Sequence, residues 1–192
     1  MFLYICGMKN RNIWVASDYH FGHPNITGPK VSRWKSGYRT FDTVHDMNVC
    51  LIETTNKYVS KDDILYFLGD FCFGGHFKTP TYRNFINCDT IHFMIGNHDK
   101  HIMKYADSFT SVNKSLIIEH NGDRIFLSHY STDKSDCDIH LFGHHHDNLK
   151  NYSGVGMDVG VDVAYRLFGE YRPFRLEEAI ELIKLSNNEI NI

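Results

Sequence analysis

Five short polar clusters, each placed directly after an apolar run, constrain most strongly what this chain of 192 residues can fold into. The clusters are Asp18-x-His20, Gly69-Asp70, Gly96-Asn97-His98-Asp99, Ser128-His129 and Gly143-His144-x-His146. Apolar runs of this length predict buried strands, and ligand sites in open α/β sheets gather beyond the carboxyl ends of strands. Carboxylates, imidazoles and amides are donors that hard and borderline divalent metals take. Each cluster alone is weak evidence, but all five in one chain predict that they converge on metal.

The apolar pattern predicts an α/β chain with more than one sheet. Apolar runs predict strands at 12–17, 64–70, 91–99, 115–119, 124–128, 138–142 and 157–163. Apolar residues at helical spacing predict helices at 42–59, 79–87, 100–107 and 176–185. Asp42 is expected to cap the first helix, and Asn121-Gly122 predicts a hairpin turn. Strands alternate with helices in the first half and give way to hairpins in the second, which is typical of a mixed α/β architecture.

Length and composition indicate one folded domain over residues 1–192. The chain is 42% hydrophobic and 22% charged, which gives it the apolar surface that disordered chains lack. No apolar run approaches the roughly 20 residues that span a bilayer, and the run at residues 2–6 is too short for a signal-peptide core. The sequence therefore predicts a cytoplasmic protein with no membrane partner, and it leaves monomer and homodimer both open.

Charge and cysteine content exclude several classes of protein. The formal net charge is -3 with His counted neutral, so no general attraction to nucleic acid or anionic membranes is expected. The five cysteines are an odd number without CxxC spacing, which favours reduced thiols over disulfides or a zinc knuckle. Thirteen histidines are typical either of metal and acid–base chemistry or of scattered surface and core positions. The polar clusters favour the first interpretation for those histidines that lie in them.

In their order along the chain, the clusters resemble the signature of the calcineurin-like metallophosphoesterase superfamily: D-x-H, G-D, G-N-H-D/E, a lone H, and G-H-x-H. The resemblance spans Asp18 to His146 and fills every ligand position with the expected residue type. It implies a four-layer α/β/β/α sandwich with two mixed sheets flanked by helices. The stretches 17–26, 69–71, 160–163 and 171–173 look like those of a subgroup of small phosphoesterases from bacteria and their phages.

The resemblance also implies two divalent metal ions and names their ligands. One ion would be held by Asp18, His20, Asp70 and His146. The other would be held by Asp70, Asn97, His129 and His144, with Asp70 bridging the pair. Mn²⁺ is the expected metal, although a mixed nitrogen and oxygen set also accepts Fe, Zn, Ni or Co.

Further side chains have implied or open roles in the reaction. The resemblance places His98 over the substrate phosphate, where it would protonate the leaving oxygen. Asp99 would either orient His98 or stabilise the turn as an Asx residue, and both interpretations stay open. His23, Asn97 and His98 are the expected substrate contacts, with a plain loop histidine as the alternative for His23.

Other polar residues near the clusters are expected to be bystanders. His145 should point away from its neighbours, and Cys72 should be packing. The arginines that could clamp a phosphate are expected instead at the surface or at helix ends; they are Arg39, Arg166 and Arg172. Substrate specificity is expected to lie in the segments 24–39, which has lid-like length and composition, and 148–175.

The activity that the resemblance implies is hydrolysis of phosphate esters by in-line attack of a metal-bridging hydroxide. Nucleotidic or cyclic-nucleotide phosphodiesters are the first expected substrates, because the chain is short and carries no added specificity domain. Phosphomonoesterase and nuclease activities are alternatives, the nuclease disfavoured by the net charge. A non-catalytic scaffold with the same fold is a different class, and it predicts eroded ligands. A structural zinc protein is disfavoured because structural zinc sites are rich in cysteine.

Overall fold

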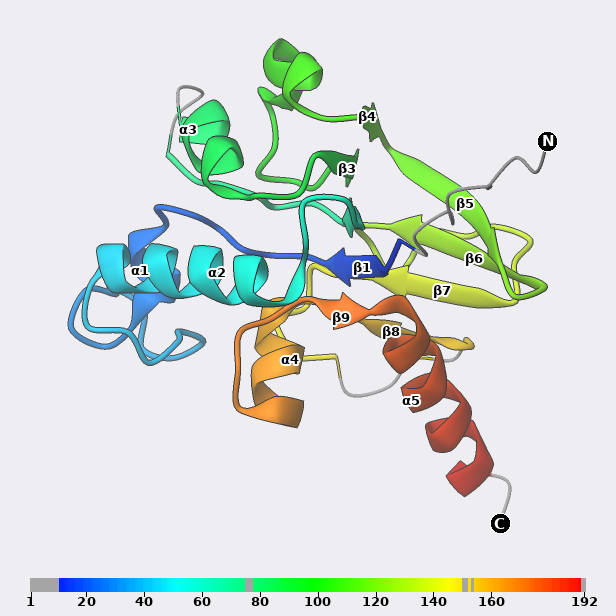
Figure 1. Cartoon of the computed structure of the whole chain (residues 1–192). Coiled ribbons are helices and arrows are strands. Elements are labelled where there is room, and N and C mark those ends of the chain that lie inside the picture. The colour runs from blue at the N-terminus through cyan, green and yellow to red at the C-terminus, as the bar shows by residue number, and fades with distance from the viewer. Residues whose placement is uncertain (1–10, 75–77, 150–151, 153, 191–192) are drawn as a thin grey trace, which may run out of the picture.

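Two mixed β-sheets and their flanking helices form the part of the chain described by this computed structural model, which is residues 11–74, 78–149, 152 and 154–190 (Figure 1). The first sheet consists, in spatial order, of β4 (Ser111–Asn113), β3 (Thr90–Met94), β2 (Ile64–Phe67), β1 (Ile13–Ala16) and β9 (Phe174–Arg175). The second consists of β5 (Ser115–His120), β6 (Asp123–Ser128), β7 (Ile139–Phe142) and β8 (Gly156–Asp158). Strands β1 to β4 are parallel, as are β6 to β8, whereas β9 and β5 pair antiparallel with their neighbours.

Helices flank the two sheets on different sides. They are α1 (Pro24–Thr27), α2 (Val44–Tyr58), α3 (Lys78–Phe85), the 3₁₀ helix η1 (Ile102–Ser108), α4 (Val161–Phe168) and α5 (Leu176–Ile190). Buried side chains of α2, such as Met47 and Leu51, pack with Phe67 on the outer face of the first sheet. Helix α5 packs against β1, β9 and β8 at the edge where the two sheets meet (Figure 1).

A second hydrophobic core lies between the two sheets. Val15 and Met94 of the first sheet share it with Leu127 and Leu141 of the second, and all four are fully buried. Burial of this apolar surface on both faces of the first sheet explains why its parallel strands read as continuous apolar runs. The predicted fold class, an α/β sandwich with two mixed sheets flanked by helices, is confirmed.

Three local predictions were wrong in detail. Helix α2 is capped by Thr43 and not by Asp42, because the Thr43 hydroxyl accepts a hydrogen bond from the Asp46 amide at 3.1 Å. The predicted strand at 157–163 is instead strand β8, a turn through Gly160, and helix α4. The predicted loop at 24–39 contains the single turn of α1, which has a proline in its first turn and His23 as its N-cap.

The structure bears only in part on the predictions about location. None of the helices within the described residues is both long enough and apolar enough to cross a bilayer. The apolar run at residues 2–6 and Cys6 lie outside the described residues. The other four cysteines are free thiols, as predicted.

Candidate metal centre

The five polar clusters meet at the carboxyl ends of strands from both sheets. Asp18 follows β1, Asp70 follows β2, and Asn97 follows β3, while His129 and His144 follow β6 and β7 of the second sheet. Possible ligand atoms lie within 4.8 Å of one another in three groups: Asp18, His20 and His146; Asp70, His129 and His144; and His20, Asp70 and His98. The predicted convergence of the clusters is therefore present in the structure.

Asp70 lies between the two predicted metal positions. Its Oδ2 is 3.5 Å from Nε2 of His20 on one side and 3.5 Å from Nε2 of His129 on the other. The Asn97 Oδ1 lies 3.0 Å from the same nitrogen of His129, which places the amide with the second group. A carboxylate with two oxygens in this position has the geometry that a bridging ligand requires.

Several of these polar atoms are buried without a protein partner, which is the test of whether the residues fit metal ions. Asp18 and His20 are 0% and 3% exposed, and Asp18 Oδ1 and His20 Nδ1 have no hydrogen-bond partner among the described residues. The Nε2 atoms of His20 and His146 are 3.1 Å apart. Burying an unpaired carboxylate oxygen is costly, so a cation beside Asp18 Oδ1 would remove a penalty that the protein alone leaves. The nitrogen that His20 turns toward this cluster is Nε2, at 3.8 Å from that oxygen. The donor set fits divalent metals.

Hydrogen bonds on the far side of two imidazoles fix which ring nitrogen is free. His129 Nδ1 donates to the Leu68 carbonyl at 2.8 Å, and His146 Nδ1 donates to the Asp162 carboxylate at 2.8 Å. A carbonyl only accepts, so the proton of His129 must lie on Nδ1. In the neutral form of each ring, Nε2 then carries a lone pair that is directed into the cluster. This is the usual arrangement of metal-binding histidines.

The backbone at the site is held in a sparsely populated conformation. Five of the seven predicted ligands have positive φ, between 49° and 78°: Asp18, His20, Asp70, His144 and His146. Non-glycine residues adopt this region rarely, and such strain clusters at functional sites. The neighbouring glycines make room for it, since a Cβ on Gly96 or Gly143 would collide with the carboxylate of Asp70 or Asp18 respectively. These glycines belong to the motifs because the ligand loops approach each other so closely.

Asp99 ties two of the ligand loops together. Its Oδ2 accepts hydrogen bonds from the amides of Asp70 and Gly96 at 2.7 and 2.8 Å, and its Oδ1 accepts one from Phe71 at 3.1 Å. Burial and the nearby charge of Asp70 raise the pKa of Asp99 to about 6. These hydrogen bonds support the interpretation of Asp99 as a residue that stabilises the turn. That Asp99 also orients His98 stays a prediction.

His23 and His98 lie together beside the first group of ligands. Their ring centroids are 6.2 Å apart, and that of His98 is 5.1 Å from His20. His23 Nδ1 caps α1 by accepting from the Asn25 amide at 3.1 Å, and burial together with the charge of His98 lowers the pKa of His23 to about 4. His23 is thus neutral at pH 7 and placed next to His98. Its contact with substrate stays a prediction.

Arg39 forms a buried ion pair behind the cluster, which sequence analysis did not foresee. Its guanidinium donates to both oxygens of Asp162 at 2.8 and 3.0 Å, and to the carbonyls of Asp18 and Tyr19 at 2.6 and 2.9 Å. Burial alone would raise the pKa of Asp162, but the charge of Arg39 and the hydrogen bonds from Arg39 and His146 hold it well below its usual range. Arg39 and Asp162 therefore fix both the strained Asp18 segment and the His146 ring.

The expected surface positions hold for only one of the three arginines. Arg166 is exposed in the last turn of α4 and pairs with Asp147 at 2.6 Å. The prediction was wrong for Arg39, and also for Arg172, which is 8% exposed and pairs with Glu178 through two hydrogen bonds of 2.9 and 2.7 Å. His145 contacts Ser131 at 2.7 Å, and Cys72 is buried against Thr79, both as bystanders.

Asp158, at the end of β8, is a further buried carboxylate close to the centre. It is 7% exposed, and its Oδ1 accepts from the Gly160 amide at 2.7 Å while Oδ2 has no partner in the described part of the chain. Burial, and after it the charge of Asp18, raises the pKa of Asp158 to about 8. The folded protein therefore favours the neutral form of this carboxyl group.

The substitution Asp158→Asn is expected to stabilise the metal-free protein at alkaline pH. Because the folded pKa lies above the unfolded value of about 4, the wild type loses stability as pH rises between those values, and the loss is complete above about pH 8. Asparagine stays neutral, so the gain at pH 9 should be on the order of a few kcal/mol and should be smaller at pH 5. Urea unfolding with chelator present, beside the exposed control Asp136→Asn, measures it. The same gain at both pH values would contradict this assignment.

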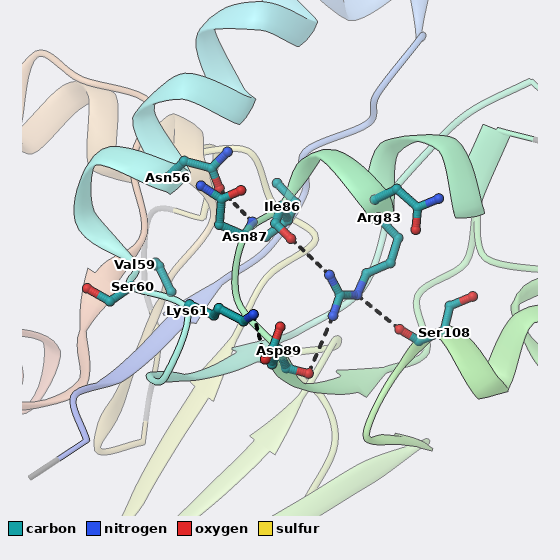
Figure 2. Close-up of a pocket in the computed structure, with 10 residues that line it drawn as sticks. Asn56, Val59, Ser60, Lys61, Arg83, Ile86, Asn87, Asp89 and Ser108 are labelled. Atoms are coloured by element: carbon teal, nitrogen blue, oxygen red, sulfur yellow. Dashed lines mark hydrogen bonds and ion pairs between the residues drawn. The ribbon is translucent and has the colours of Figure 1, made fainter. Parts of the chain in front are cut away.

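A cavity of about 680 Å³ lies away from the five clusters, and none of their residues lines it (Figure 2). It lies where the ends of α2 and α3 approach the segment 86–89. Arg83 lines it, but its guanidinium already donates to the carbonyls of Ser108 and Ile86 at 3.0 Å each (Figure 2). It also donates to the carbonyl of Cys88 at 2.8 Å. None of the described residues that could hold a metal ion lines this cavity, so the converging clusters are the candidate site.

Comparison with known proteins finds similarity in sequence to one protein and similarity in fold to several solved structures. No family model matches the chain. A crystal structure of AQ665, a protein of unknown function from Aquifex aeolicus, is similar in fold with a TM-score of 0.68 and 24% identity over 90% of this chain and 100% of that one. A structure of an archaeal phosphodiesterase gives a TM-score of 0.48 at 17% identity, over 82% of this chain and 88% of that one.

A relative in sequence can be aligned with this chain over nearly the whole length of both proteins. It is the uncharacterized protein MJ1445 of Methanocaldococcus jannaschii, which is 32% identical over an alignment of 190 residues that covers 92% of this chain and 94% of its own length. At that identity and coverage, this chain belongs to the protein family of MJ1445.

Proposed function

We propose that this protein is a dinuclear metal-dependent phosphoesterase, and within that class a phosphodiesterase acting on nucleotidic substrates. The observation that carries the proposal is the pair of ligand groups that lie on either side of Asp70, with ligand atoms within 4.8 Å in each. Every ligand position is filled, whereas a scaffold protein that had lost catalysis would be free to lose such costly buried groups.

The residues divide between the two metal positions as the sequence motifs imply. Asp18, His20 and His146 would hold one ion, Asn97, His129 and His144 the other, and Asp70 both. Two divalent ions held this way supply Lewis acidity and a nucleophile at neutral pH, the chemistry of in-line displacement at phosphorus. Mn²⁺ is the metal we expect first, and a set that mixes imidazole with oxygen ligands also accepts Fe, Zn, Ni or Co.

His98 has the position of a proton donor to the leaving oxygen. Its backbone amide donates to Asp70 Oδ1 at 2.8 Å, so its place is fixed relative to the predicted bridging ligand. Its side chain is exposed to solvent, unlike His20 and His129, and can reach a bound phosphate ester. Partial desolvation lowers the pKa of His98 and the charge of Asp99 opposes that shift, while an anionic phosphate would raise the pKa again.

Hydrolysis after metal exchange tests the proposal. The protein would be stripped with chelator, reloaded with Mn²⁺, and assayed on bis(4-nitrophenyl) phosphate and 4-nitrophenyl phosphate. We expect activity that depends on added metal and favours the diester. A preference for the monoester would overturn the choice of substrate class, and no metal-dependent hydrolysis of either ester would overturn the proposed reaction.

Metal affinity tests the role of the buried ion pair. Asp162→Asn is expected to weaken Mn²⁺ binding by about 10- to 100-fold, because the amide removes the negative charge that orients His146 and raises its basicity. Isothermal titration calorimetry measures this directly and does not depend on turnover. Glu178→Gln is the matched control, since it removes the carboxylate partner of buried Arg172 away from the centre. Equal affinities for both variants would contradict the role of Asp162.

A further inference from the structure

A second cavity, of about 250 Å³, shares a wall with the candidate metal centre. His146, one of the predicted ligands, lines it together with Asp162 and Arg39, whose ion pair holds the His146 ring. The rest of the lining also comes from the segments 26–40 and 147–171, which include parts of both regions where the sequence predicted substrate specificity. The cavity therefore adjoins the predicted metal site through His146.

The other cavities near the centre are less suited to a substrate group. A cavity lined by His98 and Asp99 has only about 40 Å³. A cavity of about 490 Å³ is lined by Gly96, Tyr130 and two lysines, but by none of the seven predicted ligands. Among these, the cavity at His146 alone combines useful volume with a wall that is part of the predicted metal site.

The charges that line this cavity are already paired. Arg39 is neutralised by Asp162, and Arg166 by Asp147, with N to O distances of 2.8 and 2.6 Å. No excess positive charge remains in these pairs for a further phosphate, and the polar carbonyl, amide and hydroxyl groups make the lining unfavourable for an acyl chain. The cavity is also below the range of about 300 to 1,000 Å³ that holds drug-sized ligands. It suits one neutral group with a hydrogen-bonding edge.

Tyrosine rings make one wall a stacking surface. The rings of Tyr165 and Tyr171 are parallel within 10° at 4.3 Å between centroids, and Arg39 and Phe41 pack on Tyr171 at 5.4 and 5.0 Å. Tyr171 is 6% exposed, whereas Tyr165 is 40% exposed and is the outer member of the stack. A planar aromatic group can extend the stack on Tyr165, which is how proteins commonly hold bases without reading their sequence.

We infer that this cavity is the nucleoside site of the enzyme, in which a nucleobase of the phosphodiester stacks on Tyr165 while the phosphate lies at the metals. The inference rests on the proposed function and adds to it the place where the nucleoside of the diester binds. Arg166 and Asp147 also line the cavity, and they would present polar groups to the edge of the base.

Two phosphate diesters that differ only in the group expected to occupy the cavity test the assignment. Thymidine 5′-(4-nitrophenyl phosphate) and methyl 4-nitrophenyl phosphate share leaving group and charge. We expect the wild type to favour the thymidine ester by at least about tenfold in kcat/KM, and Tyr165→Ala to reduce that ratio by about tenfold, the loss typical of removing a stacked aromatic side chain. Tyr165→Phe keeps the ring and should keep the ratio. Leu167→Ala, on the same helix and similarly exposed but outside the cavity, should also keep it.

A binding measurement distinguishes an error in the cavity assignment from an error in the proposed reaction. Calorimetry of the Mn²⁺-loaded protein would compare thymidine 5′-monophosphate with ribose 5-phosphate, and we expect tighter binding of the nucleotide in the wild type but not in Tyr165→Ala. If neither ester is hydrolysed but the nucleotide still binds in this way, the reaction is wrong and the cavity assignment stands. If the esters are hydrolysed equally well, or if the ratio survives in Tyr165→Ala, the cavity assignment is overturned while the proposed reaction stands.

Discussion

Replacing Asp70 with asparagine is expected to lower kcat/KM for bis(4-nitrophenyl) phosphate by more than about 100-fold, since even residues that only orient metal ligands cost about 10- to 100-fold. The side chain is buried, and its Oδ2 lies at 3.5 Å from ligand nitrogens on both sides. Asparagine keeps the shape but removes the charge that would offset repulsion between the two cations. We therefore expect bound Mn²⁺ to fall from two ions per chain to one or none.

A matched carboxylate away from the site controls for this change. Asp136 is exposed and pairs with Arg124, so Asp136→Asn should keep both activity and metal content. Burial and the charge of Asp18 raise the pKa of Asp70 to about 6, so the neutral variant should be no less stable than the metal-free wild type at pH 7. If Asp70→Asn retained full activity with two metals bound, the bridging assignment would be wrong.

Removing the His98 side chain is expected to lower kcat by about 10²- to 10⁴-fold while both metals stay bound, because this is the range for loss of a proton donor in the transition state. The loss should be larger for substrates with poor leaving groups, which need the proton, than for 4-nitrophenyl esters. Comparing kcat for a 4-nitrophenyl and an alkyl diester in His98→Ala measures this difference.

The same variant distinguishes two roles for His98. Its ring also lies within 4.8 Å of ligand atoms of His20 and Asp70, so the geometry alone would allow it to bind metal. If His98→Ala lost one Mn²⁺ per chain, His98 would be a ligand and not the proton donor. His145→Ala, which removes a neighbouring imidazole that instead contacts Ser131, should leave kcat and metal content as in the wild type.

The sequence predicted the features of this protein that depend on local pattern. Apolar runs ending in polar clusters located β1, β2, β3, β6 and β7, because buried strands and the loops after them each have a distinct composition. The order of the clusters then predicted the convergence of Asp18, Asp70 and His129. Glycines beside the ligands were part of the motifs for a physical reason, since side chains at Gly96 and Gly143 would block the ligand loops.

Features that depend on contacts between distant segments were not predictable in this way. Arg39 and Asp162 are 123 residues apart. Asp162 lies in the stretch 160–163 that carries part of the resemblance, but nothing in the sequence pairs it with Arg39. Asp162 was further hidden because 157–163 reads as one apolar strand, whereas the chain turns at Gly160 and begins α4. The stacking of Tyr165 on Tyr171 likewise depends on how α4 packs, and side-chain type alone does not reveal it.

The number of metal ions bound per chain, measured together with activity, tests the central claim most directly. Protein stripped with chelator would be titrated with Mn²⁺, with bound metal determined by equilibrium dialysis and hydrolysis of bis(4-nitrophenyl) phosphate measured at each step. The account predicts saturation at two ions per chain, with activity rising as the second ion binds. Saturation at one ion per chain or fewer, or two bound ions without hydrolysis of bis(4-nitrophenyl) phosphate, would contradict it.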